Sequence, residues 1–241
     1  MSWQRAIIVG GSSGIGAELA KQLAASGCRV AILGRNSEQM EAVVAENPSR
    51  ISAHRHDVSY FDEVPGLFQQ ITKELSGLDL FVYSSGVMPE VGADEFEFEK
   101  DQRMIDVNIS GAVAWLNQAA TRMQGTRNGT IVAIGSVAGD RGRLGQPVYN
   151  ASKAFLATYM EALRNRLSRL GVKVVTIKPG PVETPLIAHL NIANAMPVEV
   201  AASKILQKSK RGGEHYLNWK HGLIFFFIRN TPSAIFRRLK V

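Results

Sequence analysis

The hydrophobic positions of this chain form short continuous runs that alternate with longer stretches of helical periodicity. The runs predict strands at residues 6–9, 29–33, 51–56, 78–83, 130–134 and 172–177, with a short seventh near 215–217. Helical spacing predicts helices at residues 14–25, 37–46, 61–75, 98–123, 148–170 and 198–207. Several strands are almost entirely Val, Ile and Leu, which is typical of strands covered by helices on both faces. The alternation therefore predicts an α/β fold: one Rossmann-like, doubly wound domain with a parallel sheet of about seven strands.

Composition and charge narrow the possible partners. The chain has 241 residues, is 45% hydrophobic and contains one cysteine, Cys28, which leaves no internal disulfide. Of its formal charge of +7, the excess lies in residues 204–241, which hold nine Lys or Arg and one acid. The remainder is near neutral, so we expect no nucleic-acid binding. We divide the chain into a domain at 1–210 and a basic, apolar C-terminal extension at 211–241, and we expect a cytoplasmic protein.

A glycine-rich turn follows the first strand. Residues 9–16 are Val-Gly-Gly-Ser-Ser-Gly-Ile-Gly, and a predicted helix begins within them. Small residues let a backbone approach a pyrophosphate, and the helix N-terminus supplies free N–H groups. The turn therefore predicts a nucleotide site formed by Gly10, Ser12, Ser13, Gly14, Ile15 and Gly16. The same letters also fit Gly-x-Ser-x-Gly, the nucleophile elbow of α/β-hydrolases, but only nine residues precede them, so a hydrolase is a distant alternative.

The ends of the second and third strands indicate the choice of cofactor. An acid at the end of the second strand would bind the adenosine ribose of NAD, whereas an arginine accommodates the 2′-phosphate of NADP. This chain has Gly34-Arg35 there and no acid nearby, so Arg35 predicts NADP(H). Asp57, after the third strand, is placed to accept a hydrogen bond from the adenine amino group or to cap a turn.

Tyr149 and Lys153 are the leading candidates for chemistry. Their i, i+4 spacing on a predicted helix puts phenol and ammonium on one face. A nearby cation favours the phenolate, so the pair suits proton exchange with a hydroxyl or carbonyl oxygen. Alone the pair is weak evidence. Three further motifs reinforce this interpretation: Ser136 after the fifth strand, Asn108 in Asp-Val-Asn-Ile-Ser-Gly, and Pro-Gly-Pro-Val-Glu-Thr at 179–184.

With these motifs in order, residues 5–205 resemble the short-chain dehydrogenase/reductase family. The resemblance implies that Tyr149 is the general acid/base, that Lys153 holds the nicotinamide ribose and lowers the pKa of the phenol, and that Ser136 orients the substrate oxygen. It further implies a relay water at Asn108. The cofactor-binding residues would be Gly10, Ser12, Ser13, Gly14, Ile15, Gly16, Arg35, Asp57, Gly86, Tyr149, Lys153, Pro179, Gly180, Val182 and Thr184.

Two positions depart from the family pattern. Val9 stands where the family usually has Thr, and Tyr83-Ser84-Ser85-Gly86 replaces Asn-Asn-Ala-Gly, so only Gly86 transfers cleanly. The expected function is an NADP(H)-dependent interconversion of a small-molecule carbonyl and alcohol. The alternative is a non-catalytic NADP-binding sensor or scaffold of the same fold. We expect a homodimer and no metal site.

The C-terminal extension leaves two interpretations open. Its apolar residues 223–228 are followed by Thr231 and Pro232, which predict a helix start with Thr231 as the N-cap. Ile235, Phe236 and Leu239 would line one face of this helix, with Lys240 and two arginines elsewhere. Such a segment either makes peripheral contact with a membrane, which would favour a lipophilic substrate, or packs on the domain or a dimer partner.

Overall fold

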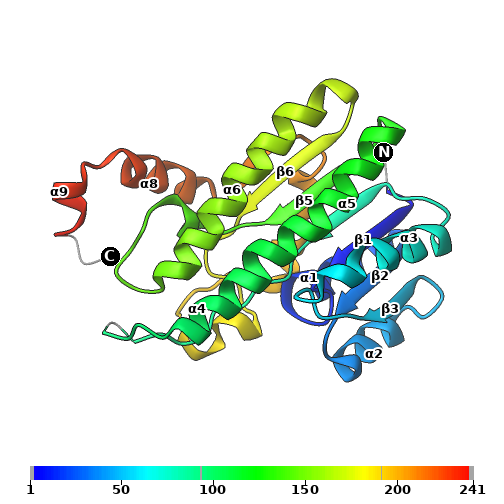
Figure 1. Cartoon of the computed structure of the whole chain (residues 1–241), viewed down its shortest axis with the longest axis horizontal. Coiled ribbons are helices and arrows are strands. Elements are labelled where there is room, and N and C mark those ends of the chain that lie inside the picture. The colour runs from blue at the N-terminus through cyan, green and yellow to red at the C-terminus, as the bar shows by residue number, and fades with distance from the viewer. Residues whose placement is uncertain (1–2, 93, 191, 239–241) are drawn as a thin grey trace.

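The strands form one parallel sheet in the order β3-β2-β1-β4-β5-β6-β7 (Figure 1). The computed structural model describes residues 3–92, 94–190 and 192–238. The strands are β1 (Arg5–Val9), β2 (Arg29–Gly34), β3 (Ile51–Arg55), β4 (Leu80–Tyr83), β5 (Thr130–Ile134), β6 (Lys173–Lys178) and β7 (Gly213–Tyr216). The strand order reverses between the neighbours β1 and β4, and a sheet of this kind binds its ligands at that point.

Helices cover both faces of the sheet. They are α1 (Gly14–Ala25), α2 (Ser37–Glu46), α3 (Val64–Glu74), α4 (Phe98–Ile105), α5 (Gly111–Thr126), α6 (Pro147–Leu167), α7 (Val198–Lys208), α8 (Trp219–Asn230) and α9 (Ser233–Phe236). In one hydrophobic cluster, α3, α5 and α6 pack on one face, and in a second cluster α1, α2 and α7 pack on the other. This arrangement confirms the predicted doubly wound fold.

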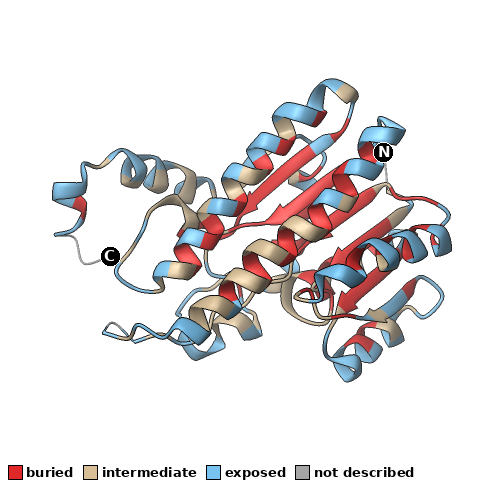
Figure 2. Ribbon diagram, viewed as in Figure 1, coloured by how far each residue is buried: buried red, intermediate tan, exposed pale blue. Residues whose placement is uncertain are grey.

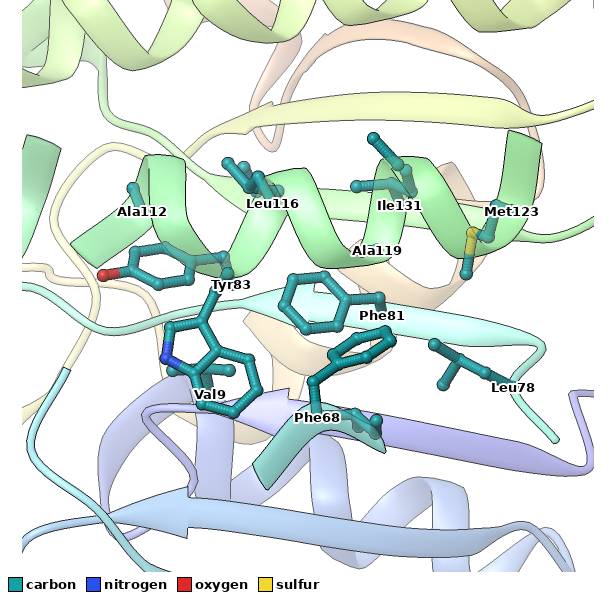
Figure 3. Close-up of a cluster of buried hydrophobic side chains, with 14 of the residues drawn as sticks. Val9, Phe68, Leu78, Phe81, Tyr83, Ala112, Leu116, Ala119, Met123 and Ile131 are labelled. Atoms are coloured by element: carbon teal, nitrogen blue, oxygen red, sulfur yellow. The ribbon is translucent and has the colours of Figure 1, made fainter. Parts of the chain in front are cut away.

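The core explains why the central strands are apolar throughout. In β1, Ile7 and Val9 point to the first cluster, whereas Ala6 and Ile8 point to the second. Both sets are fully buried because successive side chains alternate across the sheet, and the central strands are the most buried part of the chain (Figure 2). Figure 3 shows the first cluster, in which Phe81 lies between the helices and the strands.

Several predicted boundaries shift in the structure. β4 begins at Leu80, and β7 spans Gly213–Tyr216, so the sheet continues past residue 210. The predicted helix at 98–123 is present, but a π-helical turn, Asp106–Ser110, separates α4 from α5.

Cys28 is fully buried, and burial raises the pKa of its thiol to about 12.

The helix predicted after residue 231 is present, but its N-cap is Pro232 and not Thr231. Thr231 instead ends α8, with its hydroxyl donating to the carbonyl of Phe227, and Pro232 takes the N-cap position of the short helix α9. Ile235 is exposed while Phe236 is buried, so the two do not share one face; Leu239 and Lys240 lie outside the described residues. Among the described helices, none is long and apolar enough to cross a membrane.

Candidate active site

A cleft of about 390 Å³ lies at the carboxyl ends of the strands. It brings together residues that are far apart in the sequence because parallel strands all end at the same edge of the sheet. Its walls include every site residue predicted from the sequence except Gly16 and Asn108. Both are buried, and Asn108 forms hydrogen bonds with the backbone of Val87, which lines the cleft.

The glycine turn is packed so closely that side chains would not fit. Gly10 has φ of +85°, and a Cβ added there would lie 2.5 Å from the backbone nitrogen of Ser85. A Cβ on Gly16 would lie 2.0 Å from the carbonyl oxygen of Gly10. Ser13, the N-cap residue of α1, makes no capping hydrogen bond with its side chain. The first N–H groups of the helix therefore face the cleft without intrahelical acceptors, as an anion site requires.

Arg35 and Asp57 lie together at the end of the cleft beside β2 and β3. The Arg35 Nη1 atom is 3.6 Å from Asp57 Oδ2, and the Arg35 side chain is half exposed. Asp57 also accepts hydrogen bonds from the backbone N–H and the hydroxyl of Ser59, at 3.0 and 2.8 Å. Burial raises the pKa of Asp57, but these bonds and Arg35 outweigh it and leave the pKa below its ordinary value. Asp57 is therefore an anion that keeps Arg35 near the cleft.

Tyr149 lies at the start of α6, with its side chain buried in the cleft wall. Burial raises the pKa of its phenol, while hydrogen bonding with Ser136 and the charge of Arg143 oppose the rise. The net pKa lies above the ordinary value, so the phenol carries its proton at neutral pH. Arg143 is the cation that opposes the rise, and the effect of Lys153 on this pKa stays a prediction.

Lys153 is buried one helical turn after Tyr149. Its ammonium donates to the carbonyl of Ile134 at 3.1 Å and lies 5.6 Å from the centroid of the Tyr149 ring. Burial lowers the pKa of Lys153 to about 8, which still leaves it charged at pH 7. A Cβ added to Gly86 would lie 3.5 Å from this ammonium, so the backbone at Gly86 passes directly beside it.

Asn108 occupies the π-helical turn and holds the loop after β4. Its Oδ1 accepts from the N–H of Val87 at 2.8 Å, and its Nδ2 donates to the Val87 carbonyl at 3.0 Å. Tyr83, one of the departures from the family pattern, donates from its buried hydroxyl to the carbonyl of Val107 in the same turn at 2.7 Å. Sequence reasoning missed this hydrogen bond between β4 and the π-helical turn, because the periodicity of hydrophobic positions does not reveal a π-helical turn.

The segment 179–184 closes the cleft over the start of α1. Val137 donates its N–H to the carbonyl of Pro179 at 3.0 Å, which joins this segment to the turn that begins at Ser136. Val182 is buried, and a Cβ added to Gly14 would lie 3.1 Å from the methyl carbon of Thr184. The two loops that the sequence associated with one cofactor are thus in direct contact.

The pair Arg141 and Arg143 separates in the structure. Arg143 lines the cleft and donates to Asn150 Oδ1 at 3.3 Å. Arg141 turns away, donating to the carbonyl of Arg229 and the hydroxyl of Ser233. Arg143 therefore presents its charge to the cleft, whereas Arg141 anchors the C-terminal helices.

A buried ionic cluster supports the same loop from behind. Asp140, with no exposed side-chain surface, accepts from Lys178 at 2.6 Å and from the Tyr216 hydroxyl at 2.8 Å. Lys178 is equally buried and also lies 2.9 Å from Glu214. Sequence reasoning missed this cluster because its members come from β6, β7 and the loop after β5, and their proximity depends on the strand order.

Comparison with known proteins agrees with this geometry. The family model of short chain dehydrogenases matches residues 4–195. An uncharacterized oxidoreductase of Myxococcus xanthus is 37% identical over 194 residues, which cover 79% of this chain and 77% of the relative.

Solved structures share the fold. A short-chain type dehydrogenase/reductase from Mycobacterium ulcerans aligns with a TM-score of 0.82 and 24% identity, covering 90% of this chain and 89% of that chain. ElxO, solved with NADP bound, has a TM-score of 0.82 and 20% identity, with coverage of 92% and 99%.

The family's cofactor is a nicotinamide dinucleotide, and the packed glycine turn and the uncapped start of α1 suit its pyrophosphate. On the match of its sequence and the agreement of its fold, this chain belongs to the short-chain dehydrogenase/reductase family and is an oxidoreductase.

Proposed function

We propose that the protein is an NADP(H)-dependent oxidoreductase that interconverts a carbonyl and an alcohol, with Tyr149 as the general acid/base. The observation that carries this proposal is the convergence of Ser136, Tyr149 and Lys153 on the cleft that holds the glycine turn. A bound nicotinamide supplies or accepts the hydride. The residues of the chain then have to orient the substrate oxygen and move its proton.

Tyr149 is suited to donate that proton. Its raised pKa keeps the phenol protonated at neutral pH, so it can protonate the oxygen of a carbonyl that is being reduced. Ser136 accepts from the N–H of Ala138 with its hydroxyl oxygen at 3.0 Å, so its own proton can be donated to the same substrate oxygen. Charged Lys153 would hold the nicotinamide ribose and stabilise the phenolate left after transfer.

Arg35 supports NADP(H) over NAD(H). It is half exposed beside the glycine turn, where an arginine can form a charge-assisted bond with a 2′-phosphate. ElxO has the same fold and binds NADP. Asp57 does not replace a ribose-binding acid, because it follows β3, whereas the acid of an NAD site stands at the end of the second strand.

The cleft favours an apolar substrate. Six of its lining residues are aliphatic side chains from the loops that follow β4 and β6: Val87, Met88, Leu186, Ile187, Leu190 and Ile192. Transfer of apolar surface from water to such a wall contributes roughly 25 cal/mol per Å². We therefore expect larger, more apolar carbonyl compounds to bind more tightly than small polar ones.

The test is a panel of aldehydes and ketones of increasing apolar size, with loss of NADPH absorbance as the readout and NADH as the parallel cofactor. Steady NADPH oxidation, faster than NADH oxidation at equal concentration, is the expected result. NADPH binding without oxidation by any carbonyl would instead support the sensor or scaffold alternative.

A further inference from the structure

Helix α8 carries large apolar side chains that the described protein leaves exposed. Trp219, Leu223, Phe226 and Phe227 recur at three- and four-residue spacing, which places them on one side of the helix. Their exposed fractions are 74%, 54%, 57% and 63%, and the neighbouring Ile224 is 50% exposed. These five residues, here named the α8 apolar face, gather large exposed apolar side chains on one helix, and such a grouping marks an interaction site.

The opposite side of α8 is fixed to the domain. The ring of His221 packs against Gly180, where an added Cβ would lie 2.2 Å from it. Phe225 stacks on Tyr216 with ring centroids 6.5 Å apart. Arg229 lies 3.6 Å from Asp140, at the buried ionic cluster. The apolar face cannot turn inward without breaking these contacts, so its exposure is a fixed feature of the fold.

Arg141 fixes α9 beside α8. Its guanidinium lies 4.8 Å from the centroid of the buried Phe236 ring, in addition to its bonds to α8 and α9. Both helices project at one end of the molecule, far from β3 (Figure 1). A flat surface can therefore approach them without meeting the rest of the domain.

The charges around this face select the partner. Residues 215–241 hold five Lys or Arg and no Asp or Glu. Lys220, Arg237 and Arg238 are exposed. In a two-fold dimer through this face, each copy would present the same uncompensated cations to the other, which disfavours association. An anionic lipid surface satisfies both the cations and the apolar side chains.

We propose that the α8 apolar face, together with Lys220, Arg237 and Arg238, docks the protein on the surface of an anionic lipid bilayer. The helix has 12 residues and is about 18 Å long, short of the roughly 30 Å needed to span a bilayer. It therefore lies in the plane of the interface, with aromatic side chains among the headgroups and cations beside anionic lipid. The proposal does not depend on the reaction that the cleft catalyses.

The test is co-sedimentation of the full-length protein with vesicles of phosphatidylcholine alone or mixed with phosphatidylserine. We expect binding to the mixed vesicles that weakens as salt is raised. The double variant Phe226→Ser/Phe227→Ser should bind at least about 100-fold more weakly, because it removes two aromatic side chains that the bilayer would bury. The double variant Arg237→Ser/Arg238→Ser should bind about 30-fold more weakly.

The matched control is the double variant Tyr60→Ser/Arg50→Ser. Both residues are exposed near β3, at the opposite edge of the sheet from β7, so wild-type binding is expected. Circular dichroism checks that each variant is folded. Failure of the wild type to bind mixed vesicles, or wild-type binding by either α8–α9 variant, overturns the proposal. Velocity sedimentation gives a further contradicting outcome: a wild-type dimer that does not bind vesicles and that Phe226→Ser/Phe227→Ser converts to a monomer. The α8 apolar face would then join two copies of the chain, and the proposal would be overturned.

Discussion

The substitution Arg35→Ala should change the choice of cofactor without harming the fold. Arg35 is half exposed, and its ion pair with Asp57 spans 3.6 Å. An exposed pair of this kind contributes at most about 1 kcal/mol. A charge-assisted hydrogen bond to a 2′-phosphate contributes roughly 1.5–3 kcal/mol. We therefore expect NADPH binding to weaken about 10- to 100-fold, while NADH binding changes little.

Asp57 adds to this effect in the variant. Its pKa is held below the ordinary value, so the carboxylate stays ionised and, without Arg35, repels the phosphate. Isothermal titration of wild type and Arg35→Ala with both cofactors measures the change. Arg50→Ala is the control, because this exposed arginine lies before β3, outside the residues that line the cleft. Equal weakening of both cofactors, or a wild-type preference for NADH, would refute the assignment of Arg35.

Three further substitutions test the packing and charges around the cleft. Gly10→Ala should lower the free energy of unfolding by about 1–3 kcal/mol in urea titration, because its Cβ would meet Ser85 at positive φ; an unchanged midpoint would contradict this. Asp140→Asn should cost about 3 kcal/mol in the same assay, since it leaves buried Lys178 without its closest carboxylate; a loss below 1 kcal/mol would count against the cluster. The pKa of Lys153 falls from 10.5 to about 8 on folding, so the unfolded chain binds more protons between these two pH values. The free energy of unfolding of the wild type, relative to that of Lys153→Met, should therefore rise with pH across this window. A difference that does not change with pH would exclude the shift.

The sequence was sufficient for the sheet and for the lining residues that directly follow its strands. Continuous Val, Ile and Leu runs marked strands covered on both faces, and parallel strands end at one edge whatever their loops contain. Gly10, Ser136 and Thr184 could therefore be assigned to one cleft from their positions after β1, β5 and β6. Their catalytic and cofactor-binding roles remain predictions.

Features that depend on the packing of loops could not be derived in this way. Arg141 and Arg143 are two residues apart, yet one binds the C-terminal helices and the other lines the cleft. The pKa of Tyr149 is raised because burial outweighs its polar neighbours, a balance that i, i+4 spacing does not contain. The helix α8 was missed because its apolar residues 223–228 form an unbroken run without helical alternation.

The central claim is that Tyr149 transfers the proton, and Tyr149→Phe tests it most directly. The phenyl ring preserves the packing of a residue that is 7% exposed, while the hydroxyl is lost. With a carbonyl substrate found in the panel, the turnover number of NADPH oxidation should fall by about 10²–10⁴-fold. The dissociation constant for NADPH, measured on the same preparation, should stay near the wild-type value. A Tyr149→Phe variant that turns over as fast as the wild type would contradict the proposed mechanism.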